Sequence, residues 1–260
     1  MRSAFPLALC AMAGCDLVYG LGDRVEPDAP PGADVLEIDA PPTCNETTAT
    51  VEAIADATII NESTCNPANR WGASSNVNVG QNGSNGTRSR ILLRFALTAE
   101  MRDSFRPGGG FTGGSLTLHL KPDVCAAPCN SAAIGIEMYA ANNDWNEGQA
   151  TGYNGVGWCM RKQVGEMSFT QWETPGADGL QDRARNPLGR VQLTAEQAQG
   201  NSVTVPLTAS DDAVAEIGAW LDGTQLTMLL VPTTGIGTLF VKAHEYPGGG
   251  AAELAIRSCR

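Results

Sequence analysis

Hydrophobic residues recur at every second position along much of the chain, and this period restricts the fold more than any other feature of the sequence. In residues 90–97, RILLRFAL, one face carries Ile91, Leu93, Phe95 and Leu97. The segments SLTLHL and AIGIEMYA repeat the same alternation. Successive side chains of a β-strand point to opposite faces, so this pattern is typical of strands with one face in a core.

Six further segments have the composition of short strands: ATVEAIADATII, NVNVG, NSVTVPL, QLTMLLVP, GTLFVKAHE and AELAIRS. Residues rich in Gly, Pro and Asn separate them, as turns require. The connection QNGSNGT contains Asn-Gly pairs, which tolerate the positive φ of hairpin turns. Nine short strands joined in this way predict an all-β fold, a β-sandwich.

One segment departs from the two-residue period. In TASDDAVAEIGAWLDG, residues such as Val214 and Ile217 recur at helical spacing. Ser210 or Asp211 can cap the start, and Gly223 can end the helix. We therefore expect one short peripheral helix at an edge or end of the sandwich.

The N-terminus has the form of an export signal. Residues 1–14 combine Arg2, a short apolar stretch and the small pair Ala-Gly ahead of Cys15, a pattern typical of a bacterial lipoprotein signal peptide. An ordinary signal peptide cleaved elsewhere is the alternative. Residues 15–46 are acidic and Pro-rich, which predicts an extended tether, and residues 47–260 form the folded module. We expect a cell-envelope protein that is attached to the membrane only through a lipid anchor. Its folded module would be surface-exposed or periplasmic.

The net charge bears on the possible ligands, and the cysteine content bears on disulfide bonding. The net charge of −11 argues against a nucleic-acid ligand, whose phosphates would be repelled. An even number of cysteines in an exported module predicts up to three disulfides. The candidates after the anchor are Cys44, Cys65, Cys125, Cys129, Cys159 and Cys259. The tight Pro-containing loop CAAPC favours a bridge between Cys125 and Cys129. The alternative, a metal site, lacks a second close Cys or His pair.

Four stretches in fixed order resemble the DNRLRE-domain proteins, also classed as carbohydrate-binding module family 96. They are AIADATII with NRWGASSNVNVG, RSRILLRFAL, DWNEG, and the C-terminal part from VTVPL to AELAI. The string that names the family is absent, and its late Ser-Arg-Glu is KAHE in this chain. The resemblance implies a jelly-roll β-sandwich that is a non-catalytic module of exported proteins and occurs beside polysaccharide-degrading enzymes.

Catalytic motifs are not evident in the sequence. His119 lies on the outward face of a predicted strand, and His244 precedes Glu245 near a strand end, neither with a recognisable metal-ligand spacing. Pairs of carboxylates such as Asp144 with Glu147 arise by chance among 28 acidic residues. We therefore expect a protein that is not an enzyme and that binds polysaccharide. A structural or adhesive protein that contacts other proteins is the alternative, and a polysaccharide lyase or hydrolase is a third.

The long segment between predicted strands at residues 141–179 is the richest in groups that recognise sugars. Tyr153, Trp158, Arg161 and Trp172 combine aromatic planes with a hydrogen-bond donor, and long loops on a sandwich often carry binding sites. For Trp172, and for Trp145, the alternative is that the ring closes an end of the core.

A structural calcium ion is the only cofactor that the sequence suggests. Jelly-roll modules often hold one near the meeting point of the first and last strands, through carboxylates and carbonyl groups. Asp56 and Glu245 are the candidate carboxylates. Asp56 could equally cap a turn.

Overall fold

The computed structural model describes residues 44–61, 65, 71–72, 74–81, 86–121, 133–148, 155–165, 168–208 and 210–259. The expected signal peptide, the lipidation site Cys15 and nearly all of the expected tether lie outside these residues. So do Cys125 and Cys129. The described fold begins at Cys44, and its first strand at Glu46.

The described residues form thirteen strands and only short helices. The expected all-β sandwich is confirmed. The elements in chain order are β1 (Glu46–Ile60), β2 (Trp71–Gly72), β3 (Asn76–Gln81), β4 (Arg88–Ala96), α1 (Ala99–Ser104), β5 (Phe111–His119), β6 (Ile134–Ala141), β7 (Met160–Gln163), β8 (Phe169–Gln171), β9 (Gly189–Leu193), the 3-10 turn η2 (Gln197–Gln199), β10 (Ser202–Leu207), α2 (Asp211–Trp220), β11 (Gln225–Thr234), β12 (Gly237–Lys242) and β13 (Glu253–Cys259).

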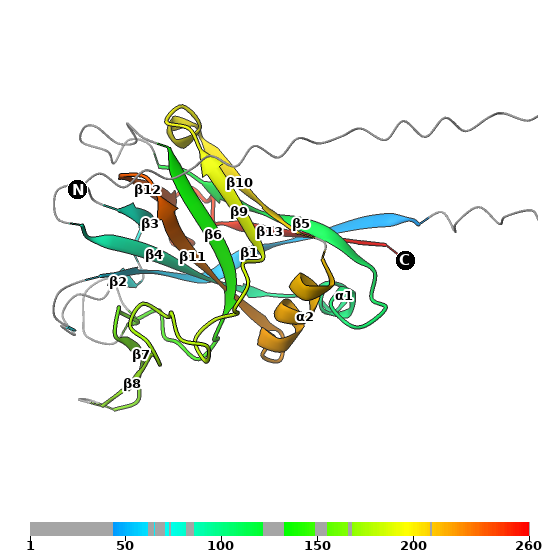
Figure 1. Ribbon diagram of the computed structural model, residues 1–260, viewed down its shortest axis with the longest axis horizontal. Helices are drawn as coiled ribbons and strands as arrows, with labels where there is room; N and C mark the ends of the chain where they lie inside the picture. The colour runs from blue at the N-terminus through cyan, green and yellow to red at the C-terminus, as the bar shows by residue number, and fades with distance from the viewer. Residues whose placement is uncertain are drawn as a thin grey trace, which may run out of the picture. The chain divides into compact units, whose positions relative to one another are not determined.

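Eleven of these strands form one large antiparallel sheet that folds back on itself (Figure 1). Its main order is β10-β5-β13-β1-β4-β11-β6-β9, and β3 links β4 to β12. The two ends of this order come together, since the backbone N–H of Thr208 after β10 donates to the carbonyl of Leu188 before β9 at 2.9 Å. The sheet is therefore nearly closed, which leaves few strand edges unpaired.

Strand β1 belongs to both layers of the sandwich. Its first half pairs with β13, from Glu46 opposite Cys259 to Glu52 opposite Glu253. Its second half pairs with β4, and the register shifts between Ala53 and Ala55, where the strand passes from one layer to the other. A register irregularity of this kind bends a strand and lets it turn a corner.

The main core lies between the layers and is built from the alternating residues that the sequence predicted. Ile91, Leu93 and Phe95 of β4 are buried there, together with Leu116 and Leu118 of β5. The outward-facing residues of β5 include His119, whose Nε2–H donates to the carboxylate of Glu253 at 3.0 Å. The period-two interpretation of these strands is confirmed.

A second hydrophobic cluster lies on the outer face of the β1–β4–β11 layer. Leu92 and Leu229 point away from the main core and are fully buried against Trp145, Val156 and Trp172. These three residues come from the long segment that follows β6. This segment therefore covers the outer face of the layer, and it carries the two-stranded β7–β8 sheet.

The predicted helix is present as α2, and its neighbour α1 was not predicted. The Ser210 hydroxyl caps α2 by accepting the Ala213 N–H at 3.2 Å, and Ile217 is fully buried. Helix α2 ends at Trp220, before the expected stop at Gly223. The two helices lie side by side (Figure 1), with Gly218 of α2 facing the Phe105 carbonyl at the end of α1. Among the described residues, no helix has the length and hydrophobicity that a membrane crossing requires.

Two disulfides connect distant parts of the described chain. Cys44 bonds Cys259, which joins the start of β1 to the end of β13, and Cys65 bonds Cys159 before β7. Four of the six predicted cysteines are therefore paired, in an arrangement that spacing alone did not indicate.

Candidate metal centre

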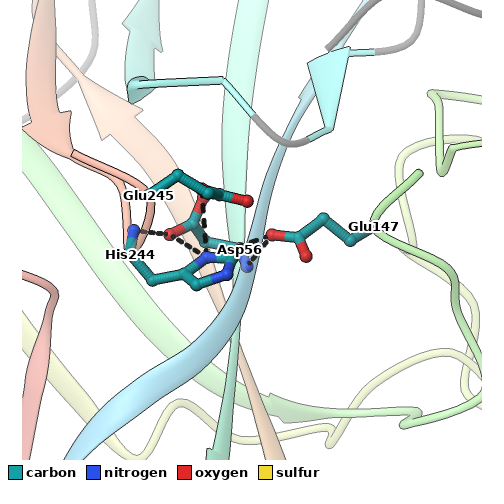
Figure 2. Close-up of side chains that lie close together, drawn as sticks. All are labelled: Asp56, Glu147, His244 and Glu245. Carbon is teal, nitrogen blue, oxygen red and sulfur yellow. Dashed lines mark hydrogen bonds and ion pairs between the residues drawn. The ribbon is translucent and has the colours of Figure 1, made fainter. Parts of the chain in front are cut away.

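Three distant segments bring Asp56, Glu147, His244 and Glu245 together, and we call these four residues the carboxylate–histidine cluster (Figure 2). Asp56 lies in β1 and Glu147 in the segment after β6. His244 and Glu245 lie in the turn after β12. One ligand atom from each residue lies within 4.8 Å of the others.

The imidazole of His244 lies among the three carboxylates. Its Nδ1 is 3.3 Å from Asp56 Oδ2, 3.2 Å from Glu147 Oε1 and 3.1 Å from Glu245 Oε2. Figure 2 shows the four side chains directed toward one another from three sides. The calcium hypothesis named two of these residues, Asp56 and Glu245, and the structure places both in the cluster.

Backbone N–H groups fix the carboxylates in place. Asp56 Oδ2 accepts the N–H of His244 at 2.6 Å, and Glu147 Oε1 accepts the N–H of Asp56 at 2.8 Å. Asp56 therefore also binds a turn, as the alternative interpretation held. These two bonds span 188 and 91 residues of sequence, so they join segments that are far apart in the chain.

Asp56 projects from β1 on the face opposite to Ala55 and Ala57, which belong to the outer hydrophobic cluster. Its side chain is only 1% exposed, and Oδ1 has no hydrogen-bond partner within the described residues. A buried carboxylate oxygen without a partner costs free energy. A cation bound in the cluster would supply the missing interaction.

Burial and mutual repulsion disfavour the charged forms of two of the carboxylates. Burial raises the pKa of Asp56 to about 6, against the opposing effect of the His244 backbone N–H, and the charge of Glu245 adds to the rise. Burial likewise raises the pKa of Glu147 to about 7, with the Asp56 backbone N–H opposing and Glu245 adding. The cluster concentrates negative charge where water cannot fully solvate it, which is the electrostatic condition that favours a bound cation.

Buried polar contacts anchor the segment that carries Glu147. Trp145 is 2% exposed, and its Nε1–H donates to the hydroxyl of Thr227 at 3.0 Å. That hydroxyl donates in turn to Asn143 Oδ1 at 2.7 Å. The guanidinium of Arg94 lies 4.3 Å from the Trp145 ring centre and donates to the Trp145 carbonyl at 2.6 Å. Trp145 is therefore a core residue, as one of the two interpretations held.

A surface hollow of about 630 Å³ adjoins the cluster and shares Glu147 with it. The polar side chains of Arg94, Asn146 and Gln163 also line it. The hollow thus brings together one guanidinium, two side-chain amides and one carboxylate.

Among the described residues, those predicted to bind sugar are not arranged as an exposed aromatic platform. Trp172 is 4% exposed, packs in the outer hydrophobic cluster and donates its Nε1–H to the Gly157 carbonyl at 3.0 Å. Its burial does not fit the binding role, because neither ring face is accessible to a ligand. Trp158 is half-buried against the same cluster, with the Arg90 guanidinium 4.9 Å from its ring centre.

Arg161 and Tyr153 complete the predicted sugar-binding set. The guanidinium of Arg161 pairs with Asp144 at 3.3 Å and lies 6.0 Å from the Trp172 ring centre. Tyr153 lies outside the described residues. The structure therefore brings Trp158, Arg161 and Trp172 into one region, but as packing and ion-pairing groups.

Two members of the cluster, Glu147 and His244, were not identified from the sequence. Glu147 was one of many acidic residues, and His244 belongs to no local ligand motif. The available signal was the pair His244-Glu245, in which two adjacent ligand types lie at the end of a predicted strand. Sequence spacing could not show that Asp56, 188 residues earlier, lies against this turn.

No known family model matches the chain, and no curated protein matches its sequence.

Proposed function

We propose that the protein is a non-catalytic binding module of the cell envelope that holds a divalent cation in the carboxylate–histidine cluster. The observation that carries this proposal is the convergence of four ligand atoms, within 4.8 Å, from three separate segments. The unpartnered Oδ1 of buried Asp56 supports it independently. The bound cation would hold the segment after β6 and the turn after β12 against β1.

Cation binding is tested on the full-length protein by thermal unfolding after removal of metals with a chelator and after addition of a divalent cation. Because a ligand that binds only the folded state raises the melting temperature, we expect a concentration-dependent rise. Glu245→Gln should abolish most of this rise. Glu196→Gln, which changes an exposed acid outside the cluster, is the matched control. A melting temperature that no divalent cation changes would refute the proposal.

Polysaccharide is the ligand class that we propose for this module. Sugars present rings of hydroxyl groups, and hydrogen-bonding side chains, those of Arg94, Asn146, Glu147 and Gln163, line the hollow beside the cluster. The resemblance to DNRLRE-domain proteins, which occur beside polysaccharide-degrading enzymes, supports the same ligand class. The signal pattern ahead of Cys15 supports a lipid-anchored location. On a glycan array we expect sugar-specific retention that Asn146→Ala reduces.

Two other functions predict different outcomes in these assays. A structural or adhesive protein would show no retention on acidic or neutral polysaccharides and would bind other proteins instead. A lyase or hydrolase would release unsaturated products or new reducing ends during incubation with polysaccharide. We propose recognition without cleavage, so the polysaccharide should be unchanged after incubation, with no unsaturated products and no new reducing ends.

A further inference from the structure

The ligand types in the carboxylate–histidine cluster differ from those of a typical calcium site. Calcium takes six to eight oxygen ligands, whereas an imidazole nitrogen suits zinc and its first-row neighbours. Here His244 Nδ1 is directed at the same space as the carboxylates of Asp56, Glu147 and Glu245. A calcium ion in that space would have the imidazole as a poor ligand or would have to displace it.

From this donor set and its geometry we infer that the site selects a zinc-type transition metal over calcium, with His244 Nδ1 as the selecting ligand. This inference rests on the proposed cation-binding function and names the class of cation.

The spacing of the donor atoms agrees with this assignment. Ligands about 2.0–2.1 Å from a tetrahedral zinc ion lie roughly 3.3 Å from one another. The distances from His244 Nδ1 to Asp56, Glu147 and Glu245 are 3.3, 3.2 and 3.1 Å. The nitrogen-to-oxygen separations are therefore close to those of a four-coordinate site, and all four ligand atoms lie within 4.8 Å of one another.

The surroundings of the cluster fix these donors in the way that metal ligands are usually fixed. Asp56 and Glu147 each accept a backbone N–H, so their orientations depend on the fold and not on free rotation of the side chains. Outer hydrogen bonds of this kind orient ligands and contribute to metal affinity. His244 and Glu245 lie in the same turn. The His244 N–H donates to Asp56, and this bond holds the turn in place.

A protonated His244 is the main rival explanation, because an imidazolium could neutralise the three carboxylates without a metal. The two explanations differ in their consequences. With an imidazolium in place, added zinc would bind weakly or not at all, because it would have to displace the proton from Nδ1.

The test is calorimetric titration of the full-length, chelator-stripped protein with zinc and, separately, with calcium. We expect zinc to bind at least tenfold more tightly than calcium. His244→Gln should weaken zinc binding at least tenfold and leave calcium binding within about threefold. His119→Gln is the matched control, since His119 has a similar exposure but pairs with the single carboxylate of Glu253. Its zinc affinity should equal that of the wild type.

The outcomes separate this inference from the function on which it rests. Calcium binding that is as tight as zinc binding, or zinc binding that survives His244→Gln, would overturn the zinc assignment and leave the cation site standing. Absence of binding by both cations would overturn both and favour the imidazolium. The comparison of zinc with calcium in the wild-type protein needs no variant, so it remains decisive if His244→Gln fails to fold.

Discussion

Replacing Asp56 by asparagine should have opposite effects on the protein without and with its cation. In the metal-free protein above neutral pH, the substitution removes a buried negative charge that lies beside Glu147 and Glu245. Asparagine keeps an oxygen that can accept the N–H of His244, so this backbone bond can persist. We therefore predict that Asp56→Asn stabilises the metal-free fold and abolishes its stabilisation by metal.

The magnitude follows from the pKa of Asp56, which burial raises from 3.8 to about 6. Because the folded state holds the proton more tightly than the unfolded state, the folded protein loses stability as the pH rises from about 4 to about 6. A shift of about two units corresponds to about 3 kcal/mol at pH 8, which is the largest gain expected from Asp56→Asn. Near pH 4 the gain should fall below about 1 kcal/mol.

The measurement is urea unfolding with chelator present, followed by tryptophan fluorescence, at about pH 4 and about pH 8. Glu196→Gln, on an exposed acid, should change the free energy of unfolding by less than about 0.5 kcal/mol at either pH. If Asp56→Asn destabilised the metal-free protein at pH 8, the carboxylate would be a favourable partner of a charged His244, and the reasoning would be refuted.

Two further predictions concern the scaffold of the site. Thr227→Val keeps the side-chain shape but leaves the Nε1–H of Trp145 and the side-chain oxygen of Asn143 without their buried partner. The free energy of unfolding, measured by urea titration, should therefore fall by about 2–5 kcal/mol. Thr204→Val at an exposed strand position should be nearly neutral, and an equal effect of both variants would contradict the buried network. Replacing both cysteines of the Cys44–Cys259 bridge by alanine, which opens a loop of 215 residues, should lower the free energy of unfolding by up to about 5 kcal/mol; an unchanged urea midpoint would contradict this.

The sequence predicted the sandwich because its alternating strands face a core on one side. Ile91, Leu93 and Phe95 could be assigned to that core from their spacing alone. The opposite face of the same strand carries Arg90 and Arg94, and its spacing did not show what would cover it. Both arginines lie over tryptophan rings from the segment after β6. A local pattern cannot show that a distant segment will cover a sheet face.

The candidate site was predicted in part. Asp56 and Glu245 were identified through the expected position of a jelly-roll cation, but Glu147 and His244 were not. Their role depends on contacts between segments far apart in sequence, which no local period encodes. The tryptophans chosen as sugar platforms show the converse limit. Composition identifies aromatic residues in a loop, but burial decides whether their faces are accessible, and Trp172 is buried.

The bridge between Cys44 and Cys259 has a mechanical consequence. Glu46 of β1 lies opposite Cys259 of β13, so the disulfide joins the two strands at the end of their hydrogen-bonded ladder. Tension that reaches the fold from the chain before Cys44 would otherwise open the ladder one hydrogen bond at a time. The disulfide transmits this force to β1 and β13 together. The two strands can then separate only if the disulfide breaks.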